Sequence, residues 1–515
     1  MNRTVLITAL VAASLAGSGA AFAKELRVAN VGDMRSAIPA GATDPGTQVP
    51  QVQIYEGLVT WREDGSVAPM LAADLPTVSS DGLVYTFRLR QGLTFHDGTP
   101  VTAQAVVKTW EYYLDPKNSW VCRNYFNGAG TVKIVGVEAK SATEVAFRLA
   151  SPSKVLLTQM ARTDCMESAI MAESMVTSGQ RPTTPIGTGP FKVTSIRPGQ
   201  DITLAKFENY KPRSEKSDGF AGRKEALVDK IVLMIIPDPA SANAALVAGN
   251  IDVWPRIELN YAKALAATPG LKVDSAATPS IYTLAFQTAK GPLQNATLRQ
   301  AINYAIDRKG MSAALTESRA TPSSSIIPAS SQFYAAAAKD GFDYDPAKAA
   351  ALLKQSGYKG EPVRITTNKN YPMMYETGVM VQGYLQAAGI NATLEVNDFA
   401  TQFSKYNTGN YDMMTWNYNP SFVPALVIDR FTGSKEKQAS KLWTDPEARK
   451  LTDELLQTPV SEQQPLYTAL QKLYVKDAPM IVWATGEVTS AYRDVVQGYS
   501  AWPGRLPRFW NVSVK

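Results

Sequence analysis

The chain has 515 residues, of which 45% are hydrophobic and 19% are charged, and its formal net charge is +6. Because single hydrophobic cores stop growing near about 250–300 residues, this length predicts two or more lobes. The charges form no basic run of the kind that binds nucleic acid or a membrane surface, and the mixed-sign segment 211–225 is expected to be a solvated loop.

Residues 1–23 have the pattern of a secretory signal peptide. Arg3 supplies a positive start, residues 4–16 are largely apolar, and Ala21-Phe22-Ala23 is a small-x-small cleavage site. The apolar stretch is too short for a membrane span, and no later segment offers roughly 18 uninterrupted apolar residues. We therefore expect an exported, soluble, periplasmic protein.

Strands and helices interleave along the chain, which predicts α/β lobes. Residues 101–116 have helical periodicity, with Thr102 as the cap and Asp115-Pro116 as the end. A single long helix is predicted over 296–315, and another over 346–358 with Gly357 after its end. The remaining predicted elements are strands at 26–30, 83–90, 143–149, 202–207, 230–236 and 363–368, a helix at 375–390, and a helix, glycine stop and strand over 240–254.

Two turn-like motifs contain residue types that also occur in catalytic or nucleotide-binding sites. The stretch FHDGTPVTAQAVVKTW, residues 95–110, contains the chain's one histidine, His96, and its Asp97-Gly98 pair suits a tight turn. A Ser-His-Asp triad would have to use His96, but no GxSxG elbow occurs. GTGP at 187–190 matches neither the P-loop nor the dinucleotide fingerprint. Both motifs are therefore predicted to be structural, and no catalytic residue is expected.

The two cysteines, Cys122 and Cys165, are predicted to form a disulfide. An exported chain meets an oxidising compartment, and an even cysteine count favours pairing. Two thiols and one distant histidine are too few ligands for zinc, and CxxC is absent. We expect neither a metal site nor a cofactor.

Five motifs occur in an order that is informative: IYEGLV at 54–59, FHDGTPVTAQAVV at 95–107, PIGTGPFKV at 185–193, AALVAGNIDV at 244–253 and LRQAINYAIDRKGM at 298–311. Together they resemble the family 5 extracellular solute-binding proteins of ABC importers, the dipeptide, oligopeptide and nickel group. The resemblance covers most of the mature chain. It implies a two-lobed, hinged α/β periplasmic binding protein of type II, in the large peptide-binding class with an extra subdomain.

The resemblance also implies a division of the chain. Lobe I would comprise residues 24–56, 186–278 and 482–515, the extra subdomain 57–185, and lobe II 279–481. Both cysteines then fall in the extra subdomain. Ligand binding would close the cleft by hinge motion before the protein meets its permease.

Three segments match the family's ligand cleft. AGATDPGTQ at 40–48 offers Thr43 and Asp44, with an exposed turn as the alternative. NKNYP at 368–372 offers Lys369 for a ligand carboxylate and Tyr371 as a wall or hydroxyl, with a surface lysine as the alternative. MMTWNYNPSFVPA at 413–425 offers a stacking face or a core residue, Trp416, followed by the neighbours Asn417, Tyr418 and Asn419.

Peptide-binding members usually have an aspartate shortly after this tryptophan, which pairs with the ligand's α-ammonium. Asn419 stands nearest that position and carries no charge. The main hypothesis is a monomeric receptor that delivers a small peptide-like solute to a permease, and the alternative is an opine-like or sugar-conjugate solute. An exported hydrolase with paired carboxylates and a chaperone-like peptide holder remain open, whereas nickel is disfavoured because one histidine cannot build its site.

Overall fold

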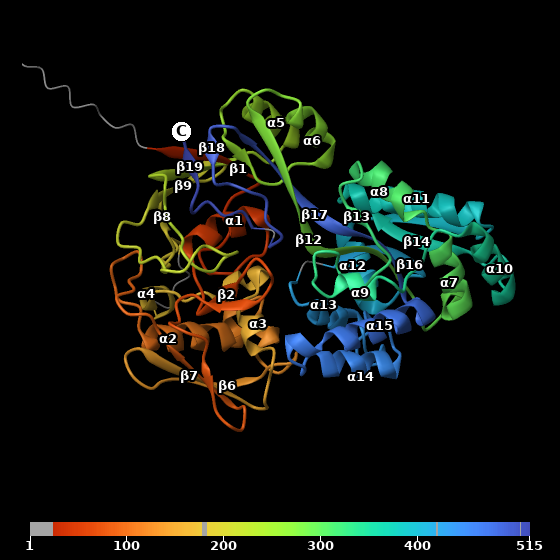
Figure 1. Ribbon diagram of the computed structural model, residues 1–515, viewed down its shortest axis with the longest axis horizontal. Helices are drawn as coiled ribbons and strands as arrows, with labels where there is room; N and C mark the ends of the chain where they lie inside the picture. The colour runs from red at the N-terminus through yellow and green to blue at the C-terminus, as the bar shows by residue number, and fades with distance from the viewer. Residues whose placement is uncertain (1–23, 178–182, 419–420, 505) are drawn as a thin grey trace, which may run out of the picture.

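The computed structural model describes residues 24–177, 183–418, 421–504 and 506–515. The predicted signal peptide, residues 1–23, lies outside these ranges. Two α/β bodies lie side by side, and the long strands β12 (Leu271–Phe286) and β17 (Met480–Arg493) run from one to the other (Figure 1). None of the helices in the described ranges is long and apolar enough to cross a membrane.

The central sheet has 11 strands and extends through both lobes. Its order is β15 (Ala392–Asn397), β14 (Val363–Asn368), β16 (Met413–Tyr418), β12, β17, β11 (Val253–Trp254), β1 (Glu25–Asn30), β10 (Lys230–Ile235), β9 (Asp201–Lys206) and β8 (Phe191–Arg197), with β13 (Thr321–Pro322) on β17. The smaller sheets contain β2 (Val59–Trp61), β3 (Val67–Pro69), β4 (Thr77–Val78), β5 (Val84–Arg88), β6 (Ile134–Ala139), β7 (Glu144–Leu149), β18 (Val496–Gln497) and β19 (Ser513–Val514).

Helices flank the sheets in both bodies, and some of them pack mainly on other helices (Figure 1). They are α1 (Pro45–Ile54), α2 (Ala103–Leu114), α3 (Leu156–Met160), α4 (Glu173–Thr177), α5 (Pro239–Val247), α6 (Leu259–Ala266), α7 (Ala296–Tyr304), α8 (Arg308–Thr316), α9 (Tyr334–Ala337), α10 (Pro346–Ser356), α11 (Pro372–Ala387), α12 (Phe399–Thr408), α13 (Pro424–Phe431), α14 (Pro446–Leu455) and α15 (Gln464–Asp477).

The antiparallel pair β12–β17 connects the lobes by backbone pairing that is interrupted at two register shifts. Its register runs from Leu271 opposite Arg493 to Ala285 opposite Met480, with a shift between Ala277 and Ile281. β11 extends the pair on the lobe I side, and β16 extends it on the lobe II side. The lobe boundaries expected at 278 and 482 fall inside these two strands.

Several helix ends follow the predicted local chemistry. The Thr102 hydroxyl accepts the Ala105 N–H at 3.1 Å and caps α2, which ends before Asp115. Gly357 ends α10 with a φ of 71°, a left-handed conformation that glycine adopts without steric cost. These boundaries were predictable because the deciding contacts lie within one helical turn.

The single helix expected over 296–315 is wrong, because the segment contains two helices. α7 ends at Tyr304, and α8 starts after Asp307, whose carboxylate accepts the Gly310 N–H at 2.9 Å. The buried Arg308 side chain donates to the Asn303 carbonyl at 3.0 Å, on the preceding helix. The new cap and this buried guanidinium reorient the chain, although the apolar periodicity continues.

The solvated loop expected over 211–225 is also wrong in part. The Arg213 guanidinium is buried and donates to the carbonyls of Met70 at 3.1 Å and Ala72 at 2.8 Å. Lys224 is 1% exposed, and its ammonium lies 3.3 Å from Glu56. Buried charges need such partners, and these partners come from distant segments. The segment therefore ties lobe I to residues 56–72.

The apolar residues of the extra subdomain are part of a core that continues into lobe I. The antiparallel sheet β4-β5-β7-β6 packs against α2, where Trp110 lies 5.0 Å from Phe126 and 5.2 Å from Phe147 between ring centroids. The expected disulfide is confirmed: Cys122 and Cys165 are joined with a Cα–Cα distance of 5.8 Å. The bond holds the segment after α3 against the loop after α2.

His96 connects the two turn motifs that the sequence singles out. Its Nε2 lies 3.0 Å from the Gly189 carbonyl, and its Nδ1 accepts the Gly187 N–H at 3.3 Å. Burial lowers the pKa of His96 to about 4, although the Gly189 contact and Asp97 act in the other direction. The imidazole is therefore neutral and structural, with its ring packed edge-on to Phe207.

Replacing both cysteines by serine should destabilise the extra subdomain. The disulfide closes a loop across a sequence separation of 43 residues. The chain-entropy model assigns about 4 kcal/mol to such a loop, so we expect the free energy of unfolding to fall by about 2–4 kcal/mol. Urea unfolding of the variant and of the reduced wild-type protein should agree, and equal stability of the variant and the oxidised protein would contradict the prediction.

His96 should make stability pH-dependent. The folded-state pKa of about 4 lies below the ordinary value of 6.5, so the unfolded chain binds the proton first. The contribution of His96 is fully present above pH 6.5 and is lost as the pH falls toward 4. Relative to His96→Gln, the wild-type free energy of unfolding should drop by about 2–3 kcal/mol across this window. Parallel pH profiles for the two proteins would contradict this assignment.

Candidate functional site

A cavity of about 680 Å³ lies where the hinge strands pass between the lobes. Lobe I and the hinge contribute polar side chains, and lobe II contributes mostly aromatic and sulfur-containing ones. Its lining comprises Thr43, Arg256, Thr278, Ser280, Tyr282, Tyr371, Met373, Met374, Phe399, Phe403, Trp416, Asn417, Tyr418, Glu487 and Val488. The cavity therefore has one polar and one apolar side, each from a different part of the chain.

Of the residues predicted from the sequence, Thr43, Tyr371, Trp416, Asn417 and Tyr418 line this cavity. Their convergence brings together segments that follow β1, precede α11 and form the end of β16.

Asp44 acts as the N-cap of α1, where its carboxylate accepts the Thr47 N–H at 3.1 Å and pairs with Arg35 at 2.7 Å. Lys369 is exposed, and its ammonium lies 5.1 Å from the centroid of the Tyr375 ring. Neither side chain lines the cavity. Asn419 lies outside the described residues.

The polar side of the cavity contains a cation and a carboxylate. Arg256 follows β11, and Glu487 lies within β17. Burial raises the pKa of Glu487, although the Thr489 hydroxyl donates to its Oε1 at 2.8 Å. Burial also raises the pKa of Tyr282, on which the charges of Arg256 and Glu487 act in opposite directions. The Tyr282 hydroxyl thus lies within the fields of both charged groups.

Gly486 keeps the polar side open. A Cβ at this position would lie 3.0 Å from the Tyr282 hydroxyl and 3.1 Å from both the Ser280 Cβ and the Thr278 Oγ1. All three neighbours line the cavity. The glycine therefore lets the hinge backbone approach these side chains closely.

The apolar side is a layer of stacked rings. The ring centroid of Trp416 lies 4.1 Å from that of Tyr406, with an interplanar angle of 11°. Its ring is also nearly parallel to those of Phe403 and Phe399, at centroid distances of 6.1 Å and 6.3 Å. Tyr371 meets Phe399 edge-on at 4.8 Å. Trp416 is only partly buried, so it both packs on α12 and lines the cavity.

Buried amides hold this apolar side together. The Asn368 amide donates to the Gln402 Oε1 at 2.9 Å, and Gln402 donates to the Thr415 carbonyl at 2.7 Å. The Asn368 Oδ1 accepts the Tyr371 N–H at 2.9 Å. Asn368, Gln402 and Thr415 are at most 1% exposed. These bonds join β14, α12 and β16, so the aromatic layer is positioned as one unit.

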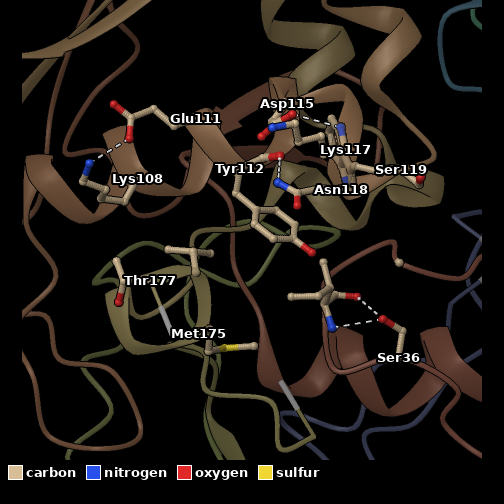
Figure 2. Close-up of a pocket in the computed structure, with 14 residues that line it drawn as sticks. Ser36, Lys108, Glu111, Tyr112, Asp115, Lys117, Asn118, Ser119, Met175 and Thr177 are labelled. Atoms are coloured by element: carbon tan, nitrogen blue, oxygen red, sulfur yellow. Dashed lines mark hydrogen bonds and ion pairs between the residues drawn. The ribbon is translucent and has the colours of Figure 1, made fainter. Parts of the chain in front are cut away.

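A second, larger cavity of about 820 Å³ lies beside the end of α2 in the extra subdomain (Figure 2). Lys108 pairs with Glu111 at 2.8 Å, and Asp115 accepts the Lys117 N–H at 2.9 Å. Asn118 donates to the Tyr112 carbonyl at 2.9 Å. These polar groups already have protein partners, and no predicted site residue lies there, so the hinge cavity is the better candidate.

Sequence reasoning missed two charged residues of the cavity, Arg256 and Glu487. Arg256 follows β11, which pairs in parallel with β1, and ligands in α/β sheets gather outside such strand ends. Glu487 is the one charged residue of the mostly apolar stretch 480–488, and an acid within such a strand is unusual. Within the described ranges, no group of three or more histidine, cysteine, aspartate or glutamate side chains could hold a metal ion.

Comparison with known proteins agrees with this architecture. The family described as bacterial extracellular solute-binding proteins, family 5 middle, matches residues 66–438. The probable peptide ABC transporter periplasmic-binding protein y4tO of Sinorhizobium fredii is 26% identical over 508 residues, covering 92% of this chain and 90% of that protein. The glutathione-binding protein GsiB of Escherichia coli O1:K1 is 26% identical over 534 residues, covering 98% of this chain and 97% of that protein.

A solved structure extends the comparison to the fold. AgaA from A. tumefaciens R10, determined in complex with agropinic acid, is 25% identical and superposes with a TM-score of 0.74 over 95% of this chain and 99% of that one. The family and the two-lobed α/β fold predicted from the sequence are thereby confirmed. Because the family match covers more than half of its residues, this chain belongs to the family 5 bacterial extracellular solute-binding proteins.

Proposed function

We propose that the protein is the periplasmic receptor of an ABC importer and that it captures its solute in the hinge cavity. The observation that carries this proposal is the position of the cavity, which is lined by lobe I, lobe II and both hinge strands. Rotation about β12 and β17 would open and close it, as hinged binding domains do around their ligands. The protein acts as a monomer, hands the solute to the permease and does not change it chemically.

The lining favours a small solute with both charged and apolar parts. Arg256 can bind an anionic group through its guanidinium, and Trp416 offers a face to a flat or apolar group. Peptide-like compounds have this combination, and so do opine-like conjugates. The names of y4tO, GsiB and the AgaA complex support these two classes.

Glu487 can supply the negative charge for a ligand's free amine that the segment after Trp416 lacks. No acid occurs between Trp416 and Asp429, yet the hinge strand supplies a carboxylate to the same cavity. Glu487 would pair with a ligand ammonium at the polar side. An ordinary peptide therefore remains compatible with the site, alongside the opine-like alternative.

The first test is mass spectrometry of what the purified protein releases on denaturation. We expect a stoichiometric small molecule with an acidic group, because the charged cavity would retain it through purification. Returning that molecule to the stripped protein should give saturable binding and no product. Conversion of the molecule would contradict the receptor proposal in favour of an exported hydrolase.

Two cation variants then decide which residue binds the solute's acidic group. Arg256→Gln should weaken binding of the released solute by about 10–100-fold, since a hydrogen bond to a charged group contributes about 1.5–3 kcal/mol. The matched control Lys369→Gln removes a cation near the site but outside the cavity. We expect a change of less than about threefold for it. Affinities are measured by isothermal titration calorimetry. A larger loss of affinity in Lys369→Gln than in Arg256→Gln would assign the anion site to Lys369.

Trp416 should provide a stacking surface. Trp416→Ala is expected to weaken binding by about 5–50-fold, because aromatic contacts contribute about 0.5–1.5 kcal/mol beyond their buried area. Trp416→Phe keeps a ring against Tyr406 and should lose much less. Melting temperatures separate lost packing from lost binding, and equal affinities for the alanine variant and the wild type would contradict the role.

A further inference from the structure

A side chain of lobe II, close in sequence to the cavity residue Tyr418, packs against the other side of the hinge outside the solute cavity. Phe422 lies between β16 and α13, and its ring centroid is 5.5 Å from that of Trp61 in β2 and 5.5 Å from that of Trp502, which follows β18. Phe422 is partly buried. One phenylalanine thus bridges two tryptophans that belong to the other side of the hinge.

The receiving surface is built from lobe I and the start of its extra subdomain, which contributes Trp61. Trp61 and Trp502 are each 2% exposed, and Phe220 lies 4.1 Å from Trp502 on the lobe I side. The Arg508 guanidinium lies 5.1 Å from the Trp502 ring and pairs with Glu63 at 3.1 Å. We call Trp61, Trp502 and Phe220 the aromatic socket. Contacts between lobe I and its extra subdomain, such as the Arg508–Glu63 pair, hold the socket in place.

Two glycines shape the socket. A Cβ at Gly65 would lie 3.1 Å from the Phe422 Cβ, and the φ of +78° at Gly65 disfavours any other residue. A Cβ at Gly504 would lie 1.6 Å from the Trp502 ring. The backbone at Gly65 and Gly504 therefore lies so close to Phe422 and Trp502 that a side chain at either glycine would displace the neighbouring ring.

The socket lies close to the hinge but does not belong to the solute cavity. Pro279 of β12 lines a crevice together with Trp61 and Phe422, whereas its neighbours Thr278 and Ser280 line the solute cavity. Phe422 is absent from the lining of that cavity. Because Tyr418 of the same segment lines the cavity, the distance between the lobes, and not affinity alone, is the readout that tests the role of Phe422.

We propose that Phe422 is a positioning residue that holds the two lobes together by docking in the aromatic socket. Hinge opening separates lobe II from lobe I and exposes the faces of three aromatic rings to water, which is unfavourable. Docking therefore raises the closed population, and the apparent affinity for a solute rises with the fraction of protein in the competent state. The inference depends on the hinge geometry and not on the identity of the solute.

The test measures the distance between the lobes directly. Spin labels attached through Ala142→Cys in the extra subdomain and Lys354→Cys on α10 report that distance by pulsed dipolar spectroscopy. Both positions are exposed, and the two native cysteines are joined in the disulfide and do not react. Phe422→Ala should raise the ratio of long to short distances about tenfold in solute-stripped protein.

The matched control is Tyr344→Ala, which removes a 51% exposed ring from lobe II away from the socket. It should leave the distance distribution unchanged. If Phe422→Ala and Tyr344→Ala give the same distribution, the proposal is overturned, whether the lobes are then open or closed. Failure of the solute proposal would leave this measurement unaffected.

A second comparison separates the docking contact from a general loss of packing. Phe422→Leu keeps an apolar side chain in the socket and should give an intermediate distance ratio. Trp502→Phe combined with Phe422→Ala should open the lobes no further than Phe422→Ala alone, because both act through one contact. Additive effects would contradict the socket as the site of action. Where a solute copurifies, its release on dilution should also be about tenfold faster in Phe422→Ala.

Discussion

The antiparallel pairing of β12 with β17 is the constraint on which the rest of this molecule depends. Each strand is long enough to be part of both lobes. The same pair of strands therefore belongs to the sheet of each lobe and also forms the connection between them. The register shift between Ala277 and Ile281 lies within the crossover. Such irregularities bend a strand and redirect its side chains. Thr278 and Ser280 are consequently turned into the cavity, so hinge and binding surface share one piece of backbone.

Each side of the hinge is stiffened by buried polar groups. In lobe II, the Asn368–Gln402 amides hold the aromatic layer. In lobe I, Glu56 accepts a hydrogen bond from Tyr210 at 2.8 Å and pairs with Lys224, whose ammonium also lies 4.6 Å from the Trp510 ring centroid. Such groups specify one arrangement of segments, because a buried polar group without its partner is costly. We therefore expect motion between the lobes to be concentrated at the crossover.

If the hinge cavity binds the solute and Phe422 docks as proposed, the solute and the lobes are held by different kinds of contact. Charged and hydroxyl groups from the hinge meet stacked rings from lobe II inside the cavity, where pairing and desolvation determine which solute fits. Outside the cavity, Phe422 and the aromatic socket join the lobes through apolar surface that is indifferent to the solute. Separate surfaces for selection and closure would let affinity change without a change in selectivity.

The amino-acid sequence by itself determined the features that depend on neighbours within a turn or on composition. Thr102 caps its helix and Gly357 ends another, the paired cysteines form a disulfide, and the ordered motifs identify the family. The prediction of one long helix from apolar periodicity was wrong at Asp307, because this residue caps a new helix although the apolar periodicity continues.

Only the tertiary structure decided which side chains converge. Asp44 had the chemistry of a ligand but caps α1, and Lys224 had the chemistry of a surface residue but is buried against Glu56. Arg256 and Glu487 meet at one cavity although they come from distant strands. The physical reason is that capping and turn formation act over a few residues. The burial and pairing of a charge, in contrast, depend on segments that folding brings together from elsewhere in the chain.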